Sequence, residues 1–67
     1  MNKSEIKKYV EDQIAYHCDE FGLVREEVLT VVLLNCIEYF RRGELSKEDL
    51  LDCADYLNLV IDLDEIE

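Results

Sequence analysis

The chain has 67 residues, a formal net charge of −10, no proline and two glycines. A chain of this length has room for one domain, 1–67, and buries only about 60% of the surface that it exposes when unfolded, so it is marginally stable alone. Its apolar content of 49% is typical of a globular protein, and its excess of acidic residues disfavours direct contact with the phosphates of nucleic acids.

The sequence also argues against a membrane span, an export signal and a disulfide framework. The most apolar stretch, residues 28–37, has about half the length needed to cross a bilayer and is flanked by glutamates. No apolar signal segment follows the charged N-terminus. The cysteines are odd in number, lie far apart and contain no C-x-x-C pair: Cys18, Cys36 and Cys53. This pattern favours reduced thiols and a cytoplasmic protein.

A first helix is predicted over about residues 4–21. Its apolar face consists of Ile6, Val10, Ile14, Cys18 and Phe21, which recur at helical spacing. Asn2 and Glu5 match a capping box at its start, because the Asn side chain can accept from the backbone N–H three residues on. Gly22 suits the left-handed position that ends many helices. His17 falls within the apolar face, where we expect a hydrogen-bonded core or boundary residue.

A second helix is predicted over about residues 24–42. Glutamates near its start and arginines near its end suit the helix dipole, and Gly43 ends it. Eight of the ten residues 28–37 are apolar, so this helix needs cover on more than one side. A strand over residues 28–37 would find no partner strand elsewhere in the chain, which favours the helix.

A third helix is predicted over about residues 47–62, followed by an acidic tail over residues 62–67. Ser46 is a good N-cap, and Leu45 with Leu50 matches a hydrophobic staple. The predicted core stripe consists of Leu50, Cys53, Ala54, Leu57, Val60 and Ile61. The predicted fold class is therefore all-α, a three-helix bundle with short connections and roughly antiparallel neighbours.

Most of the negative charge lies in residues 44–67, which hold nine acidic residues and one lysine. The candidate partner-binding residues in this part are Glu48, Asp52, Asp55, Tyr56, Leu59 and Asp62. Their four acids form one stripe on the predicted third helix, opposite its core face, and the two apolar residues lie in or beside it. Two interpretations stay open. The stripe keeps the protein soluble, or it docks onto a basic protein partner by imitating the charge of a nucleic-acid backbone.

The second helix carries the predicted self-association residues, which are Leu33, Leu34, Asn35 and Ile37. The three apolar residues are expected to extend beyond the face that two neighbouring helices cover, and an exposed patch of this kind is typical of an interface. Asn35 falls in a broad apolar face, where a buried amide without a partner costs roughly 1–3 kcal/mol. It pairs across an interface, or it lies at the bundle edge and bonds to water. We expect a homodimer through this helix.

Sequence patterns of catalytic, metal and DNA-binding sites are weak or absent. The turn at Gly22 resembles the spacing of helix-turn-helix DNA-binding proteins, but the second helix would present Glu26 and apolar residues to the bases. His17, Cys36 and Cys53 match no zinc spacing, and free cysteines commonly fill cores. The sequence has no glycine-rich phosphate loop, no calcium loop and no carboxylate pair at catalytic spacing. It therefore predicts no enzyme, cofactor, bound metal or direct nucleic-acid contact.

The sequence as a whole predicts a small acidic protein–protein interaction module. This module self-associates through its second helix and presents its acidic third helix to a protein partner. The alternative is an inhibitor that mimics nucleic acid and occupies the basic site of a DNA- or RNA-binding protein. The identity of the partner and the salt dependence of binding distinguish these two functions.

Overall fold

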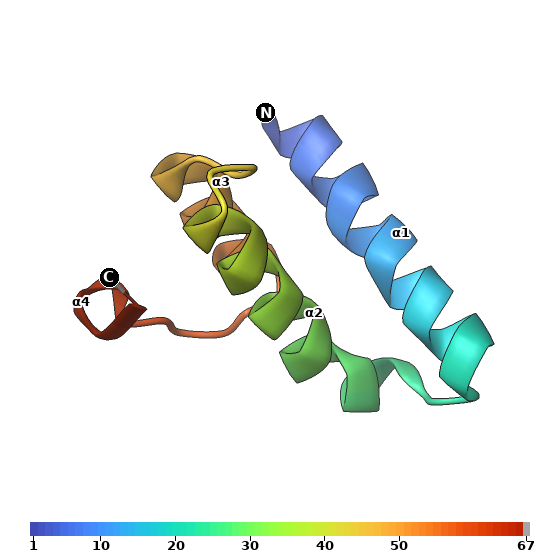
Figure 1. The fold of residues 1–67 in the computed structure, drawn as a ribbon. Helices are drawn as coiled ribbons and strands as arrows, with labels where there is room; N and C mark the ends of the chain where they lie inside the picture. Colours follow the sequence, from blue (N-terminus) through green and yellow to red (C-terminus); the bar gives the residue numbers. More distant parts are fainter. Residues whose placement is uncertain (67) are drawn as a thin grey trace.

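The computed structural model describes residues 1–66, and of residue 66 only the backbone. Its helices are α1 (Lys3–Phe21), α2 (Arg25–Arg41), α3 (Lys47–Tyr56) and the single turn α4 (Leu63–Ile66), and the described residues contain no strand. Each of the three longer helices packs against the other two (Figure 1). The predicted all-α three-helix bundle is confirmed.

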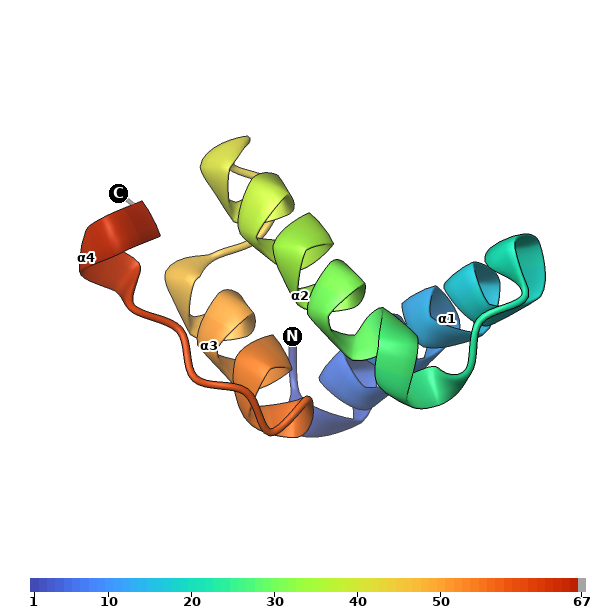
Figure 2. The same cartoon turned by 90° about the horizontal axis from the view of Figure 1, so that it is seen from below.

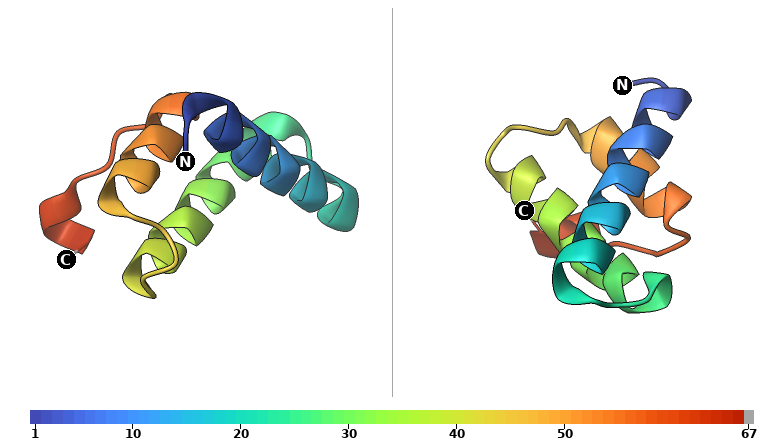
Figure 3. Two further views of the ribbon diagram at one scale, coloured as in Figure 1. Left: turned by 90° about the horizontal axis from the view of Figure 1, so that it is seen from above. Right: turned by 90° about the vertical axis from the view of Figure 1, so that its right-hand side faces the viewer.

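The chain turns back after α1 to form a helical hairpin with α2, and α3 then packs on this hairpin (Figure 2). The segment after α3 passes along the outer side of α3, so that α4 lies at the edge of the bundle away from α1 (Figure 3). One long flank of the α1–α2 hairpin is therefore left without a covering helix.

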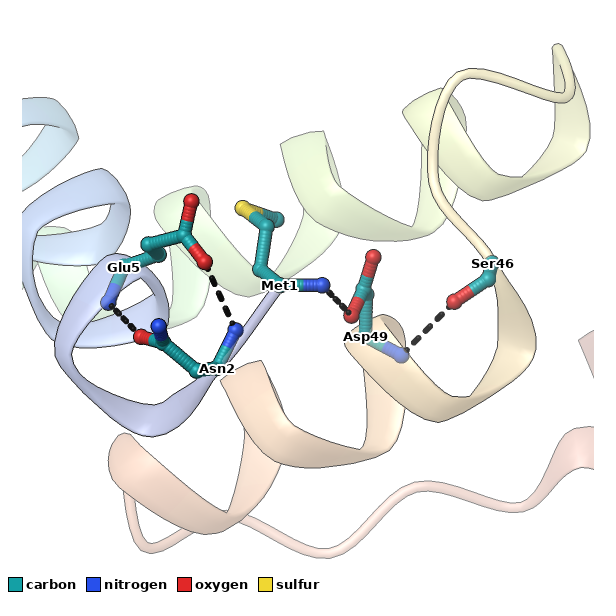
Figure 4. A network of polar contacts seen from close by, with 5 residues as sticks. All are labelled: Met1, Asn2, Glu5, Ser46 and Asp49. Atoms are coloured by element: carbon teal, nitrogen blue, oxygen red, sulfur yellow. Dashed lines mark hydrogen bonds and ion pairs between the residues drawn. The ribbon is translucent and has the colours of Figure 1, made fainter.

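Local capping chemistry starts α1 and α3, and ends α1, where the sequence predicts. Asn2 and Glu5 form a reciprocal capping box at the start of α1, with both N–H···O distances 2.9 Å (Figure 4). The Ser46 hydroxyl accepts from the Asp49 backbone N–H at 3.1 Å and caps α3. Gly22 ends α1 with a φ of 64°, a backbone conformation that costs glycine nothing. These three predictions are confirmed.

A contact that lies outside these caps joins the start of the chain to α3. The Met1 ammonium group lies 2.9 Å from the Asp49 carboxylate, at the first turn of α3 (Figure 4). Asp49 therefore has two roles, because its backbone N–H bonds to Ser46 while its side chain holds the N-terminal residue against the helix.

The core lies where the three helices meet, and its buried residues are Ile6, Val10, Ile14, Val28, Val32, Leu33, Cys36, Leu45, Leu50, Cys53, Ala54 and Leu57. It includes most of the apolar face predicted for α1. Phe21 departs from that prediction, because it lies at the last turn of α1 and is 61% exposed. Leu45 and Leu50 are both buried, as a hydrophobic staple requires.

The third helix is shorter than predicted: α3 ends at Tyr56, not at residue 62. Asn58 has a φ of 59° and takes the left-handed position after the helix. The backbone N–H groups of Leu59 and Asn58 then bond back to the carbonyls of Ala54 and Asp55, at 2.9 and 3.0 Å. This is a Schellman ending with asparagine in the place of glycine.

The early end of α3 leaves residues 57–62 outside the helix. Val60 is 99% exposed and does not belong to the core, whereas Ile61 is half-buried against it. Asp62 does not extend the acidic stripe, because it lies beyond the end of α3. Its carboxylate instead accepts from the Asp64 backbone N–H at 3.0 Å, at the start of α4. Of the predicted acidic tail, residue 67 lies outside the described residues.

Candidate functional site

The uncovered flank of the α1–α2 hairpin contains two adjoining hollows, of about 320 and 380 Å³. Tyr9, Gln13 and Tyr39 line both hollows; Asp12, Tyr16, His17 and Asn35 complete the first, and Glu44 completes the second. We call these eight residues the tyrosine groove. Tyr9, Gln13 and Tyr16 recur at helical spacing beside the core stripe of α1, so one flank of that helix supplies one wall.

A polar contact between the two helices lies in this groove. The side-chain nitrogen of Asn35 on α2 is 2.9 Å from Nε2 of His17 on α1. An amide nitrogen can only donate, so in this contact Asn35 donates to the ring. The other ring nitrogen, Nδ1, is buried and has no hydrogen-bond partner among residues 1–66. His17 is thus a boundary residue bonded to its own chain, as expected.

Four exposed side chains surround the His17–Asn35 contact, and we call them the exposed rim: Tyr16, Phe21, Val31 and Leu34. Their exposed fractions are 60%, 61%, 39% and 59%. The Tyr16 ring meets His17 edge-on at 5.4 Å, and the Phe21 ring stacks on it at 5.7 Å. Val31 lies one turn before Leu34 and Asn35 on α2 and is therefore their neighbour.

The structure separates the four predicted self-association residues. Leu33 is only 7% exposed and belongs to the core, and Ile37 is half-buried against it. The prediction that these two extend beyond the covered face is wrong, because both pack into or against the core that α2 forms with α1 and α3. Leu34 is exposed as predicted. Asn35 is half-buried and has a partner in its own chain, which neither alternative for it foresaw.

The predicted partner-binding residues also fall into two groups, one exposed and one half-buried. Glu48, Asp52 and Asp55 are exposed and follow one another along one face of α3, and within the described residues none of them forms an ion pair. We call these three the acidic stripe. Leu59 is not an exposed anchor, because it is half-buried against the core. Tyr56 is half-buried as well.

Tyr56 belongs to a polar cluster that joins all three helices. Arg25 on α2 binds the Glu11 carboxylate on α1 through two nitrogens, each at 2.7 Å. The Tyr56 hydroxyl on α3 donates to the same carboxylate at 2.5 Å. The hydrogen bonds from Arg25 and Tyr56 lower the pKa of Glu11 to about 2. Sequence reasoning missed this cluster because its members lie 14 and 45 residues apart.

Replacing Glu11 by glutamine is expected to lower the free energy of unfolding by about 1 kcal/mol. The reason is the loss of the two charge-assisted hydrogen bonds between Arg25 and the half-exposed Glu11 carboxylate. The pKa of Glu11 is lowered in the fold from an ordinary value of 4.5, so its stabilisation is present above pH 4.5 and disappears as the pH falls towards 2. Thermal unfolding across this range should show the difference between wild type and Glu11→Gln shrinking with falling pH. Glu20→Gln, at an exposed position of α1, is the control. A difference that does not change with pH would contradict the assignment.

The cysteines lie inside the bundle and are free thiols. Cys36 and Cys53 are fully buried, and the side-chain nitrogen of Gln13 lies 4.0 Å from the Cys36 sulfur. Hydrogen bonding to Cys36 and burial raise the pKa of the Cys53 thiol, while the same bond lowers that of Cys36. Among the described residues, no group of three or more His, Cys, Asp or Glu side chains is placed to hold a metal ion.

Comparisons with known proteins give no relative from which a function can be carried over. The chain matches no family model, no curated protein and no solved structure. Within residues 1–66, no helix has the length and apolar character needed to cross a membrane.

Proposed function

We propose that this chain is a small protein–protein interaction module that self-associates through the uncovered flank of α1 and α2. The exposed rim carries this proposal, because four large side chains lie exposed around one point of that flank. Monomeric proteins rarely expose large apolar patches, and aromatic residues are enriched at interfaces.

The distribution of charge supports a second copy of the chain as the occupant of this flank. Residues 23–43, which include α2, hold three arginines and three glutamates and have no net charge. Residues 44–67 have a net charge of −8, and apart from Glu44, which lines the groove, the described ones belong to α3, α4 and their connections. Two copies that meet through α2 keep their acidic parts apart, so that repulsion between them is small. A two-fold axis through the rim would place Leu34 against its own counterpart.

Sedimentation equilibrium at micromolar concentrations tests this proposal. We expect the wild-type protein to show a reversible monomer–dimer equilibrium. Its melting temperature should then rise with protein concentration, because dimerisation stabilises only the folded chain. A wild-type protein that stays monomeric at all concentrations would contradict self-association.

The second part of the proposal is that α3 presents the acidic stripe to a basic protein partner. The observation in its favour is the absence, in the part of the chain that the structure describes, of any ion pair to these three exposed carboxylates. The more specific candidate is an inhibitor that occupies the nucleic-acid site of a DNA- or RNA-binding protein. Competition by nucleic acid for the same partner would identify it.

Neutralising the acidic stripe by Glu48→Gln, Asp52→Asn and Asp55→Asn together should leave the fold intact. Exposed charges contribute little to stability, and removing three neighbouring like charges reduces repulsion. Binding to poly-L-lysine, a model basic partner, should weaken, and its dependence on salt should flatten. The measurements are thermal unfolding and a titration with poly-L-lysine at two salt concentrations.

The control variant neutralises Asp19, Glu20 and Glu26, which makes the same change of net charge outside the acidic stripe. If both variants lose the same affinity for poly-L-lysine, the acidic stripe is not a binding surface and serves only solubility.

A further inference from the structure

The tyrosine groove combines aromatic faces and carboxylates without a cation. Tyr9 and Tyr39 line both of its hollows and Tyr16 lines one, while Asp12 and Glu44 supply negative charge. None of the eight described residues that line it is lysine or arginine. A tyrosine ring attracts a cation to its face, and a nearby carboxylate adds to this attraction. The groove thus has the chemistry of a receptor for a positively charged side chain.

Two amide oxygens in the groove are left for a ligand. The side-chain nitrogen of Asn35 is engaged by His17, and that of Gln13 lies against the Cys36 sulfur. Within residues 1–66, the oxygens of these two amides have no side-chain partner. A guanidinium group carries five N–H donors in a plane, so it can stack on a ring and bond to amide oxygens at its edge. Lysine offers only a compact ammonium group, which makes arginine the better fit.

The size and charge of the groove agree with a single side chain as the ligand. Hollows of about 320 and 380 Å³ are at the lower end of the range of about 300–1,000 Å³ found for small-molecule pockets. Lys8 contacts Asp12 at 2.9 Å and Arg42 contacts Glu44 at 3.8 Å, but the side chains of both pairs are more than half exposed. Such surface pairs are weak and can exchange for a better-placed cation. Burial raises the pKa of Tyr9 to about 12, so its phenol stays neutral at physiological pH.

We propose that the tyrosine groove receives an arginine side chain of a basic partner protein. The guanidinium plane lies against the ring of Tyr39, which lines both hollows, and its N–H groups donate to the amide oxygens of Gln13 and Asn35. The carboxylates of Asp12 and Glu44, which also line the groove, balance the positive charge of the guanidinium group. This inference rests on the proposed binding of a basic partner, and it gives that partner a second contact on the opposite side of α1 from α3.

The test is an NMR titration of the full-length chain, labelled with ¹⁵N, with N-acetyl-arginine amide. N-acetyl-citrulline amide is the matched control ligand, because it has almost the same shape and no charge. We expect saturable shifts at the backbone amides of Gln13, Tyr16 and Tyr39 with the arginine ligand, and affinity at least about fivefold lower with citrulline, the size of one cation–π contact. Equal binding of both ligands would overturn the proposal. So would shifts confined to the acidic stripe.

Matched variants separate the ring face from the hydroxyl. Tyr39→Phe keeps the ring and should change the affinity for arginine by less than about twofold, whereas Tyr39→Leu should lower it about fivefold. If Tyr39→Leu lowers the melting temperature, intermolecular NOEs in the wild-type protein between the side-chain protons of the arginine ligand and the ring protons of Tyr39 test the same contact, and their absence would overturn it. Equal effects of leucine and phenylalanine would overturn the assignment. The variant with a neutralised acidic stripe should retain the response.

Tyr16 belongs both to the groove and to the exposed rim, so the proposed dimer would cover part of the groove. The titration is therefore made with the Leu34→Lys variant as well as with the wild type, because this variant is expected to be monomeric and its groove open. If the NMR shifts of the groove residues do not change with arginine in either protein, the proposed arginine site is wrong, whatever the sedimentation experiment gives. If the wild-type protein stays monomeric, self-association is wrong, and the arginine titration still tests the groove.

Discussion

Leu50→Ala is expected to lower the free energy of unfolding by about 3 kcal/mol, within the range of about 2–5 kcal/mol for truncating a buried leucine. Leu50 is fully buried where the first turn of α3 meets the other helices. Domains have about 0.05–0.15 kcal/mol of stability per residue, which gives a chain of this length roughly 3–10 kcal/mol. The loss is therefore about a third or more of the total, and the variant should unfold at a much lower urea concentration than the wild type. Urea denaturation followed by circular dichroism measures the difference.

The neighbouring residue provides the control for this prediction. Leu51 is 41% exposed, so Leu51→Ala makes the same chemical change at a position that buries far less surface. We expect Leu51→Ala to cost less than about 1 kcal/mol, because a partly exposed side chain loses little on truncation. If the two variants lowered the free energy of unfolding by similar amounts, α3 would not pack through the face that contains Leu50.

Leu34→Lys is expected to convert a dimeric wild type into a monomer. In a two-fold interface each substitution counts twice, so two buried leucines are lost and two ammonium groups are brought together. At about 1.5 kcal/mol or more for each side chain, the dissociation constant should rise by at least about a hundredfold. Sedimentation equilibrium gives this constant, and the dependence of the melting temperature on protein concentration should vanish with the dimer.

Leu51→Lys is the control for Leu34→Lys, because it introduces the same charge at an exposed leucine of α3. The dimer should persist in this variant. If Leu51→Lys dissociated the protein as well, the contact between copies would involve α3, and the exposed rim would lose its assigned role.

Helix starts and glycine ends could be predicted because their causes are local. The contacts between Asn2 and Glu5, and between Ser46 and Asp49, span three residues, so the sequence alone contains both partners. The end of α3 has an equally local cause that was missed. Asn58 takes a left-handed conformation there, and asparagine does so less often than glycine, so the apolar periodicity through Val60 and Ile61 outweighed it.

The orientation of α2 could not be predicted, because its apolar residues leave no single face marked for the core. Leu33 and Leu34 are adjacent and chemically identical, yet one is 7% exposed and the other 59%. Only the packing of α2 against both α1 and α3 decides between them. The exposed rim could be inferred in part, since a helix that is apolar nearly all round must leave something uncovered in so short a chain.

The sequence by itself determined the all-α class, the helix starts and most of the core, because capping contacts and helical periodicity act over a few residues. It also determined that the negative charge gathers after residue 43. Only the tertiary structure decided the contacts of Glu11 with Arg25 and Tyr56, the contact of His17 with Asn35, and the tyrosine groove. These features join residues from different helices, and their formation depends on how the helices rotate and pack, which no local pattern in one helix specifies.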